Sequence, residues 1–162
     1  MGLDADQRRR VLRHPAGWIA LGFGAGLSPV APGTAGSLAA LLPWLLLREL
    51  PLPYYVAALA LTFALGVWVC GWAVRELRTA DPAAVVWDEF VGLWIALLPL
   101  VARPPVGGWV LAGFMLFRLF DITKPWPVSW ADRRVRGGPG VMLDDVVAGA
   151  YAAAALELLR LV

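Results

Sequence analysis

Five carboxylates stand beside apolar segments of the chain, as two adjacent pairs and one single residue: Asp88, Glu89, Asp121, Asp144 and Asp145. Ionisable groups next to membrane-like segments are costly to bury and usually serve a function. Carboxylates that gather at one place repel one another, and a divalent cation is the simplest group to neutralise them. The chain has a single His and a single Cys, so a Cys/His zinc cluster is excluded and oxygen ligands favour Mg²⁺ or Mn²⁺.

Cationic and hydroxyl side chains accompany these carboxylates. Arg118 shares a helix face with the carboxylate three residues later, and Lys124 and Arg133 follow in a polar stretch. Thr34 and Ser37 belong to a Gly-Thr-Ala-Gly-Ser sequence that opens an apolar segment. Backbone N–H groups at such a helix start can bind phosphate. These five residues are therefore predicted to bind an anionic substrate group.

Each feature also has a purely structural interpretation. An acidic pair at a helix N-terminus stabilises the helix dipole, Arg118 can form a structural ion pair, and the arginines at 133–136 can face lipid headgroups. Three glycines can be close-packing positions between helices, as small residues often are in membranes: Gly33, Gly36 and Gly92. These interpretations explain each feature alone, but not the joint pattern.

The composition favours a chain in contact with lipid. It has 162 residues, which indicates one domain; 60% are apolar and 16% charged. Soluble domains have about 25% charged residues, and a small protein has too little interior to bury this apolar excess. Disorder and a disulfide scaffold are excluded. Only one of the fourteen basic residues is Lys, and we interpret the arginine excess as a topology signal rather than nucleic-acid binding.

The apolar segments predict an all-α polytopic membrane bundle of about five main helices, after a short interfacial or re-entrant helix near residues 17–24. The main helices are expected at 34–47, 54–74, 81–102, 109–120 and 142–160, with turns at 51–53 and 104–108 and a polar loop at 124–140. The third is expected to begin with Asp81 as N-cap and Pro82 at its first position. A basic N-terminal cytoplasmic segment, 1–15, precedes the helical domain, 16–162.

Positive charge marks the cytoplasmic side of short loops. Arginines at 8–13 place the N-terminus inside, Arg75 and Arg78 lie inside after two spans, and the basic residues at 124–136 lie inside after four. This topology places all five carboxylates, with Thr34 and Ser37, at the cytoplasmic ends of their helices.

Other functions fit less well. A His-based lipid phosphatase needs at least two histidines, and a Cys-x5-Arg phosphatase motif is absent. A small transport or ion-pathway subunit would spread its carboxylates through the bilayer depth. A scaffold that binds anionic lipid through arginines would not need five carboxylates at one level. Metal-dependent phosphate chemistry is the remaining prediction.

Four sequence motifs resemble the signatures of the phosphatidylglycerophosphatase A family, in order and at similar spacing: residues 22–38, 86–92, 117–127 and 137–149. The resemblance covers about residues 16–150. It implies an all-helical, Mg²⁺-dependent enzyme of the bacterial inner membrane. Such an enzyme removes the terminal phosphate of phosphatidylglycerophosphate, a membrane phospholipid, to give phosphatidylglycerol.

Together, the residues and the resemblance assign roles to the site. One residue of each adjacent pair, together with Asp121, is expected to hold one or two Mg²⁺ ions, because neighbouring helical side chains point about 100° apart. Arg118, Lys124 and the 34–37 segment would hold the phosphate. Glu89 could act as general base on a water molecule, or Asp121 could form an aspartyl-phosphate. The residues predicted to be catalytic are Asp88, Glu89, Asp121 and Asp145.

Overall fold

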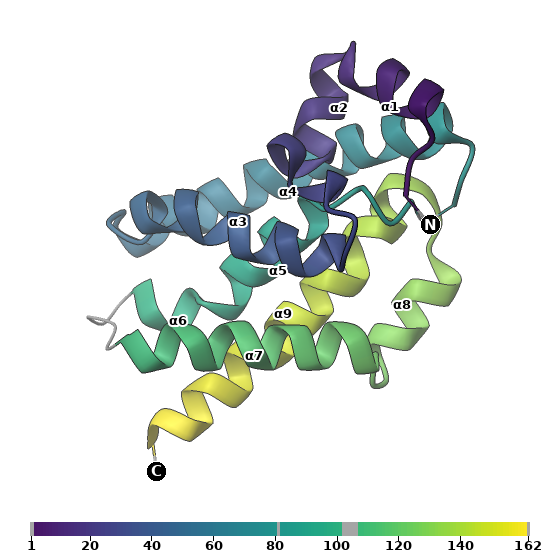
Figure 1. The fold of residues 1–162 in the computed structure, drawn as a ribbon. Helices are drawn as coiled ribbons and strands as arrows, with labels where there is room; N and C mark the ends of the chain where they lie inside the picture. Colours follow the sequence, from purple (N-terminus) through teal and green to yellow (C-terminus); the bar gives the residue numbers. More distant parts are fainter. Residues whose placement is uncertain (1, 81, 102–106, 162) are drawn as a thin grey trace.

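The computed structural model describes residues 2–80, 82–101 and 107–161, and in these ranges every regular element is helical (Figure 1). The elements are, in chain order, α1 (Ala5–Leu12), α2 (Pro15–Ala20), the 3-10 helix η1 (Gly22–Leu27), α3 (Pro32–Leu47), α4 (Leu52–Leu77), α5 (Trp87–Ala96), α6 (Leu98–Val101), α7 (Gly107–Thr123), α8 (Val128–Arg134) and α9 (Gly137–Leu161). The predicted all-α class is confirmed, and the five predicted main segments overlap α3, α4, α5, α7 and α9.

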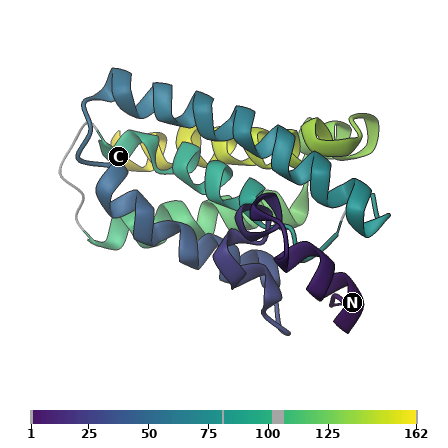
Figure 2. The same cartoon turned by 90° about the horizontal axis from the view of Figure 1, so that it is seen from above.

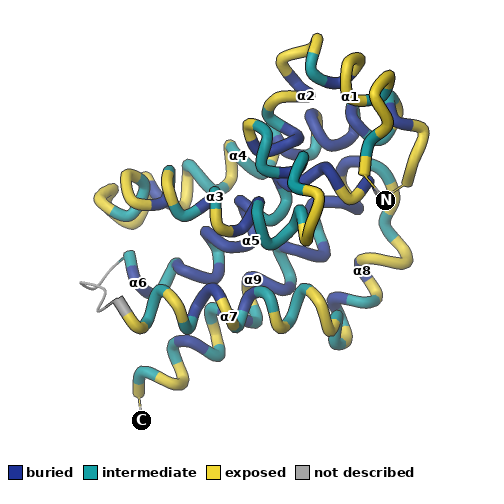
Figure 3. The backbone as a smooth tube through the Cα atoms, in the orientation of Figure 1, coloured by how far each residue is buried: buried dark blue, intermediate teal, exposed yellow. Residues whose placement is uncertain are grey.

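Helix α5 lies at the centre of the bundle, in contact with α3, α4, α7 and α9 (Figure 2). Most of its residues are buried, as its dark tube in Figure 3 shows. The Trp94 indole N–H donates to the Ala40 carbonyl of α3 (2.8 Å), and the Tyr55 hydroxyl of α4 donates to the Trp94 carbonyl (2.7 Å). Buried polar groups of large aromatic residues need such partners, so these bonds fix α5 against both neighbours.

Small residues let α5 and α9 approach closely. A Cβ atom on Gly149 of α9 would overlap the carbonyl oxygen of Gly92 in α5. A Cβ atom on Gly92 would lie 2.8 Å from the Asp145 carbonyl oxygen and 2.6 Å from the Phe117 ring. Gly92 is therefore a close-packing position, as its structural interpretation predicts, and the contact brings Asp145 alongside α5.

The predicted start of the central helix is wrong. Helix α5 begins at Trp87, and residues 82–86 are not helical; Asp81 lies outside the described residues. The Val86 N–H donates to the Ala20 carbonyl of α2 (2.9 Å). This stretch therefore lies against α2 and does not extend α5 towards its N-terminus.

Two predicted loops also contain helix. Helix α8 lies within the stretch predicted as a loop, and α9 begins at Gly137 rather than near Met142. Gly107 and Gly108, predicted to form a turn, open α7, whereas 104–106 lie outside the described residues. The last helix is thus longer at the end where it carries acidic residues.

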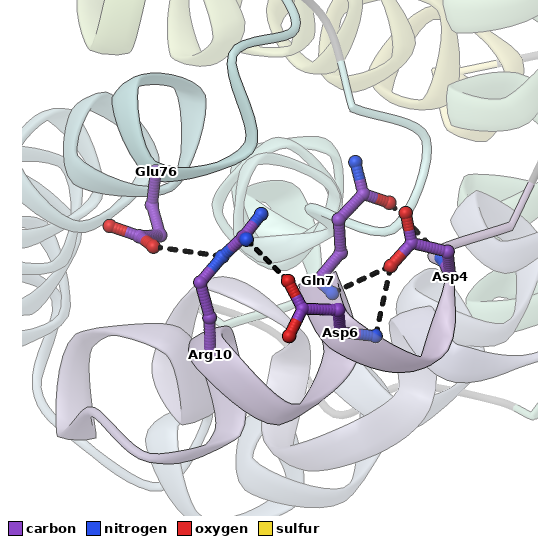
Figure 4. A network of polar contacts seen from close by, with 5 residues as sticks. All are labelled: Asp4, Asp6, Gln7, Arg10 and Glu76. Carbon is purple, nitrogen blue, oxygen red and sulfur yellow. Dashed lines mark hydrogen bonds and ion pairs between the residues drawn. The ribbon is translucent and has the colours of Figure 1, made fainter.

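The N-terminal basic segment forms helix α1, which is attached to α4 (Figure 4). The Asp4 carboxylate accepts hydrogen bonds from the backbone N–H groups of Asp6 and Gln7, and the Gln7 side chain accepts one from the Asp4 N–H, which makes a capping box. Arg10 of α1 forms an ion pair with Glu76 near the end of α4 (3.2 Å). Helix α1 therefore lies beside the C-terminal end of α4.

Large apolar side chains remain exposed on the outer faces of the bundle. On α7 they recur at helical spacing, at Leu111, Met115, Leu119 and Ile122. Among the described helices, α4 is long and apolar enough to cross a membrane, and only 28% of its most apolar stretch is buried. Helix α3 is apolar but shorter. A monomer with apolar faces of this extent normally meets a membrane or a partner there.

Candidate active site

Four helices bring their polar ends together at one end of the bundle. Helices α3, α5 and α9 lead away from this end and α7 leads towards it, so the first turns of α3 and α5 meet the last turns of α7 (Figure 1). Each of these helices contributes residues that the sequence analysis singled out.

Three carboxylates converge where α5 and α9 touch. Asp88, Glu89 and Asp145 each offer one oxygen, and these oxygens lie within 4.8 Å of one another. Asp145 is only 3% exposed. Among the described residues, Asp88 Oδ1, Glu89 Oε2 and Asp145 Oδ2 are buried without a hydrogen-bond partner. Unpaired buried oxygens are costly, and converging carboxylate oxygens are the ligands that Mg²⁺ prefers. The donor set therefore fits a hard divalent cation.

Asp121 extends this group from α7. It lies within hydrogen-bonding reach of Asp145 and also faces Glu89. On its own helix it forms an ion pair with Arg118, from Nη1 to Oδ2 at 2.6 Å. One guanidinium thus faces a group of four carboxylates, which leaves the end of the bundle strongly negative in the absence of a bound cation.

Arg118 also connects this group to α3. Its Nη1 donates to Ser37 Oγ (3.4 Å), and the Ser37 hydroxyl donates to the Gly33 carbonyl (2.9 Å). A Cβ atom on Gly33 would overlap Glu89 Oε1 and lie 3.3 Å from Arg118 Nη2, so a larger residue there would displace the Glu89 carboxylate. Thr34 lies on the same helical turn, but no hydrogen bond among the described residues joins its hydroxyl to the site.

Asp144 points to a different partner than Asp145 does. Lys124 donates to Asp144 Oδ2 (2.7 Å) and also to Asp132 of α8. Burial acts to lower the pKa of Lys124, but the two carboxylates outweigh it and hold that pKa above its usual range. Lys124, predicted as a phosphate ligand, lies between these two carboxylates, which neutralise its charge in the structure.

A pocket of about 330 Å³ adjoins the carboxylates. Asp88 and Asp144 line one part of it, and Asp132, Arg133 and Arg136 line another. Arg133 was predicted as a site residue. The sequence analysis grouped Arg136 with headgroup-facing arginines and did not consider Asp132. The signal available for Arg136 was its spacing, three residues beyond Arg133.

The chain is similar to known proteins over most of its length. A family model described as phosphatidylglycerophosphatase A matches residues 18–160. The chain is 43% identical to phosphatidylglycerophosphatase A of Escherichia coli, covering 94% of this chain and 88% of the relative. It is 43% identical to the protein of the same name from Haemophilus influenzae (87% and 86% covered). It is 45% identical to a Bacteroides thetaiotaomicron protein provisionally described as a phosphatidylinositol-3-phosphatase (82% and 86% covered). No solved structure matches the chain significantly.

Proposed function

The chain belongs to the phosphatidylglycerophosphatase A family, and from that premise we propose that it hydrolyses phosphatidylglycerophosphate to phosphatidylglycerol and phosphate, using Mg²⁺. The observation that carries the proposal is the convergence of three carboxylates, each with one buried oxygen that has no hydrogen-bond partner among the described residues, beside a pocket with two arginines. In this role the enzyme supplies a phospholipid for membrane biosynthesis.

The relatives' names support the class of bond. Phosphatidylglycerophosphate and phosphatidylinositol 3-phosphate both carry a phosphomonoester on the headgroup of a glycerophospholipid. Hydrolysis of that monoester is the chemistry common to the two names, and a site rich in oxygen ligands and arginine suits it.

The position of each residue in the site suggests its role in the reaction. Asp88, Glu89 and Asp145 would hold the cation, which when bound polarises the phosphoryl oxygens and lowers the pKa of a water molecule. Arg118 lies beside them, and its Nε has no hydrogen-bond partner among the described residues. Its guanidinium can therefore donate to phosphoryl oxygens and stabilise the charge that develops on them.

The ion pair at Asp121 supports water as the group that attacks phosphorus. Arg118 occupies Asp121 Oδ2, which lowers the nucleophilicity of that carboxylate and favours water over an aspartyl-phosphate. Glu89 has two carboxylate oxygens, so one of them can accept the proton of the water while the other holds the cation. The water oxygen then bonds to phosphorus, and the phosphorus–oxygen bond of the monoester breaks. The glycerol oxygen leaves with the proton that Glu89 had accepted, which returns Glu89 to its carboxylate form.

The ion-pathway alternative is not favoured. Such a pathway needs ionisable groups through the depth of the bilayer, whereas these carboxylates gather at one end of the bundle. We further propose a multi-pass protein of the bacterial inner membrane whose site faces the cytoplasm. The exposed apolar faces of α3, α4 and α7 and the arginines at the site end of α4 support this topology.

Phosphate release from short-chain phosphatidylglycerophosphate by the full chain in detergent tests the activity. Mg²⁺ should support release, EDTA should abolish it, and Asp88→Asn, Asp121→Asn and Asp145→Asn should each lower the rate by orders of magnitude. Glu49→Gln is the matched control, because Glu49 is paired with Arg48 at the opposite end of α3. Full activity in EDTA, or near-normal rates for all three variants, would contradict the proposal.

The topology has its own test. Cys70 is buried and is the sole native cysteine, so Cys70→Ser gives a background for single cysteines at Leu52 and Thr79, the two ends of α4. An impermeant thiol reagent on intact cells should label position 52 only. Labelling at position 79 instead would show that the site lies at the outer face of the membrane.

A further inference from the structure

The pocket beside the carboxylates has two parts of opposite charge. Asp88 and Asp144 are buried or half-buried at one part, and Arg133 and Arg136 are exposed at the other. Within the described ranges, neither arginine forms an ion pair with a protein carboxylate, whereas the neighbouring Asp132 is already paired with Lys124. The pocket therefore holds two positive charges that no described acidic side chain neutralises.

We propose that Arg136 and Arg133 bind the phosphodiester of the lipid substrate while its phosphomonoester lies at the carboxylates. The assignment rests on the proposed function. Guanidinium groups bind phosphate oxygens through paired, charge-assisted hydrogen bonds. The two parts of the pocket would thus recognise the two phosphates of one headgroup, and the arginines would decide which lipids enter.

The spacing of the phosphates then defines the substrate class. In phosphatidylglycerophosphate, three carbon atoms separate the oxygen of the diester from that of the monoester, and the middle carbon carries a hydroxyl. The same arrangement runs from position 1 to position 3 of the inositol ring in phosphatidylinositol 3-phosphate. A pocket with two phosphate-binding parts would accept both headgroups. It would discriminate against phosphatidate, which has no diester.

Arg134 provides an internal control. It has the same charge and lies in the same stretch of chain, but it lines a different recess, together with Trp126, Ser129, Trp130 and Arg133, and does not line the pocket beside the carboxylates. Arg136 lines the pocket beside the carboxylates and not this recess, whereas Arg133 lines both. General attraction between an arginine cluster and anionic lipid would depend on both residues alike, whereas a phosphodiester site depends on Arg136.

Binding of short-chain phosphatidylglycerol tests the assignment without metal or turnover, because this lipid carries the diester alone. Calorimetric titration of the detergent-solubilised full chain in EDTA should show affinity weakened about tenfold by Arg136→Gln and by Arg133→Gln, the effect of one charged hydrogen bond. Arg134→Gln should bind like the unmodified chain. With Mg²⁺, the KM for short-chain phosphatidylglycerophosphate should rise about as much in the first two variants only.

Equal affinity in the unmodified chain and both pocket variants would overturn the proposal. So would an equal loss in all three variants, which would indicate general charge attraction. Circular dichroism checks that the variants fold, and Arg136→Lys replaces Arg136→Gln if that variant does not. A chain that releases no phosphate yet shows this binding pattern would refute the proposed function and retain the phosphodiester site.

Discussion

Replacing Asp145 by Asn should stabilise the cation-free protein while abolishing its activity. Asp145 is 3% exposed, and its cluster oxygen lies within 4.8 Å of those of Asp88 and Glu89. Two unit charges at that separation repel by about 3.5 kcal/mol at an effective dielectric constant of 20. Proton uptake by one carboxyl relieves part of this repulsion. Removing the charge is therefore expected to increase the free energy of unfolding by about 1 to 3 kcal/mol.

Mg²⁺ should reverse the order of stability. A cation that binds only the folded state stabilises it by about 2.7 kcal/mol at a concentration one hundred times its Kd. The unmodified chain should gain this stabilisation, and Asp145→Asn, which lacks one ligand charge, should gain far less. The melting temperature of the variant should thus be higher than that of the unmodified chain in EDTA and lower in Mg²⁺.

Thermal unfolding in detergent, followed by circular dichroism in EDTA and in Mg²⁺, measures both effects, at about 2 to 4 °C per kcal/mol. Glu49→Gln should follow the unmodified chain in both buffers. A variant that melts below the unmodified chain in EDTA and keeps its full response to Mg²⁺ would refute the reasoning. Asp145 would then stabilise the fold through its own contacts and would not be a cation ligand.

Three further experiments probe the packing and the ion pairs. Gly149→Ala should destabilise the fold by about 1 to 3 kcal/mol, because the new methyl group overlaps the α5 backbone; Gly108→Ala, in open space, should not, and denaturant unfolding compares the two. Lys124→Met and Asp132→Asn should show a coupling energy of about 1 kcal/mol or more in a double-mutant cycle, which a lysine devoted to substrate would not show. Arg118→Lys keeps the charge but cannot match the planar contacts to two partners, so kcat should fall about tenfold with little change in melting temperature.

Much of the helical framework could be predicted from the sequence, because long apolar runs bounded by charge are local features. The start of α5 could not. Asp81-Pro82 is a good local helix start, but the bond from the Val86 N–H to the Ala20 carbonyl depends on where α2 lies. A tertiary contact of this kind overrides local preference and has no signal near residue 82.

Which residues gather at the candidate site could be predicted from the sequence better than the directions of their side chains. Adjacent helical residues diverge by about 100°, and Asp144 and Asp145 do turn to different partners. Asp88 and Glu89 nevertheless share one cluster. Helix α5 begins between α3 and α9, so the directions of both side chains lead into the protein. The ion pairs of Lys124 depend on how α8 packs, for which the sequence held no signal, and the spacing of Arg136 from Arg133 was the only hint of its place in the pocket.

The burial of the site indicates the order in which a lipid enters it. The carboxylates are buried or half-buried, whereas Arg133 and Arg136 are exposed. Two large tryptophans, Trp126 and Trp130, are also exposed nearby, and aromatic residues of this kind suit a membrane interface. A lipid enters with its acyl chains outside, so the terminal phosphate, farthest from the chains, reaches deepest. The phosphodiester, which is three carbon atoms closer to the acyl chains, then lies beside Arg133 and Arg136. Because the acyl chains stay in the membrane, the monoester, and not the diester, reaches the carboxylates where the proposed hydrolysis takes place.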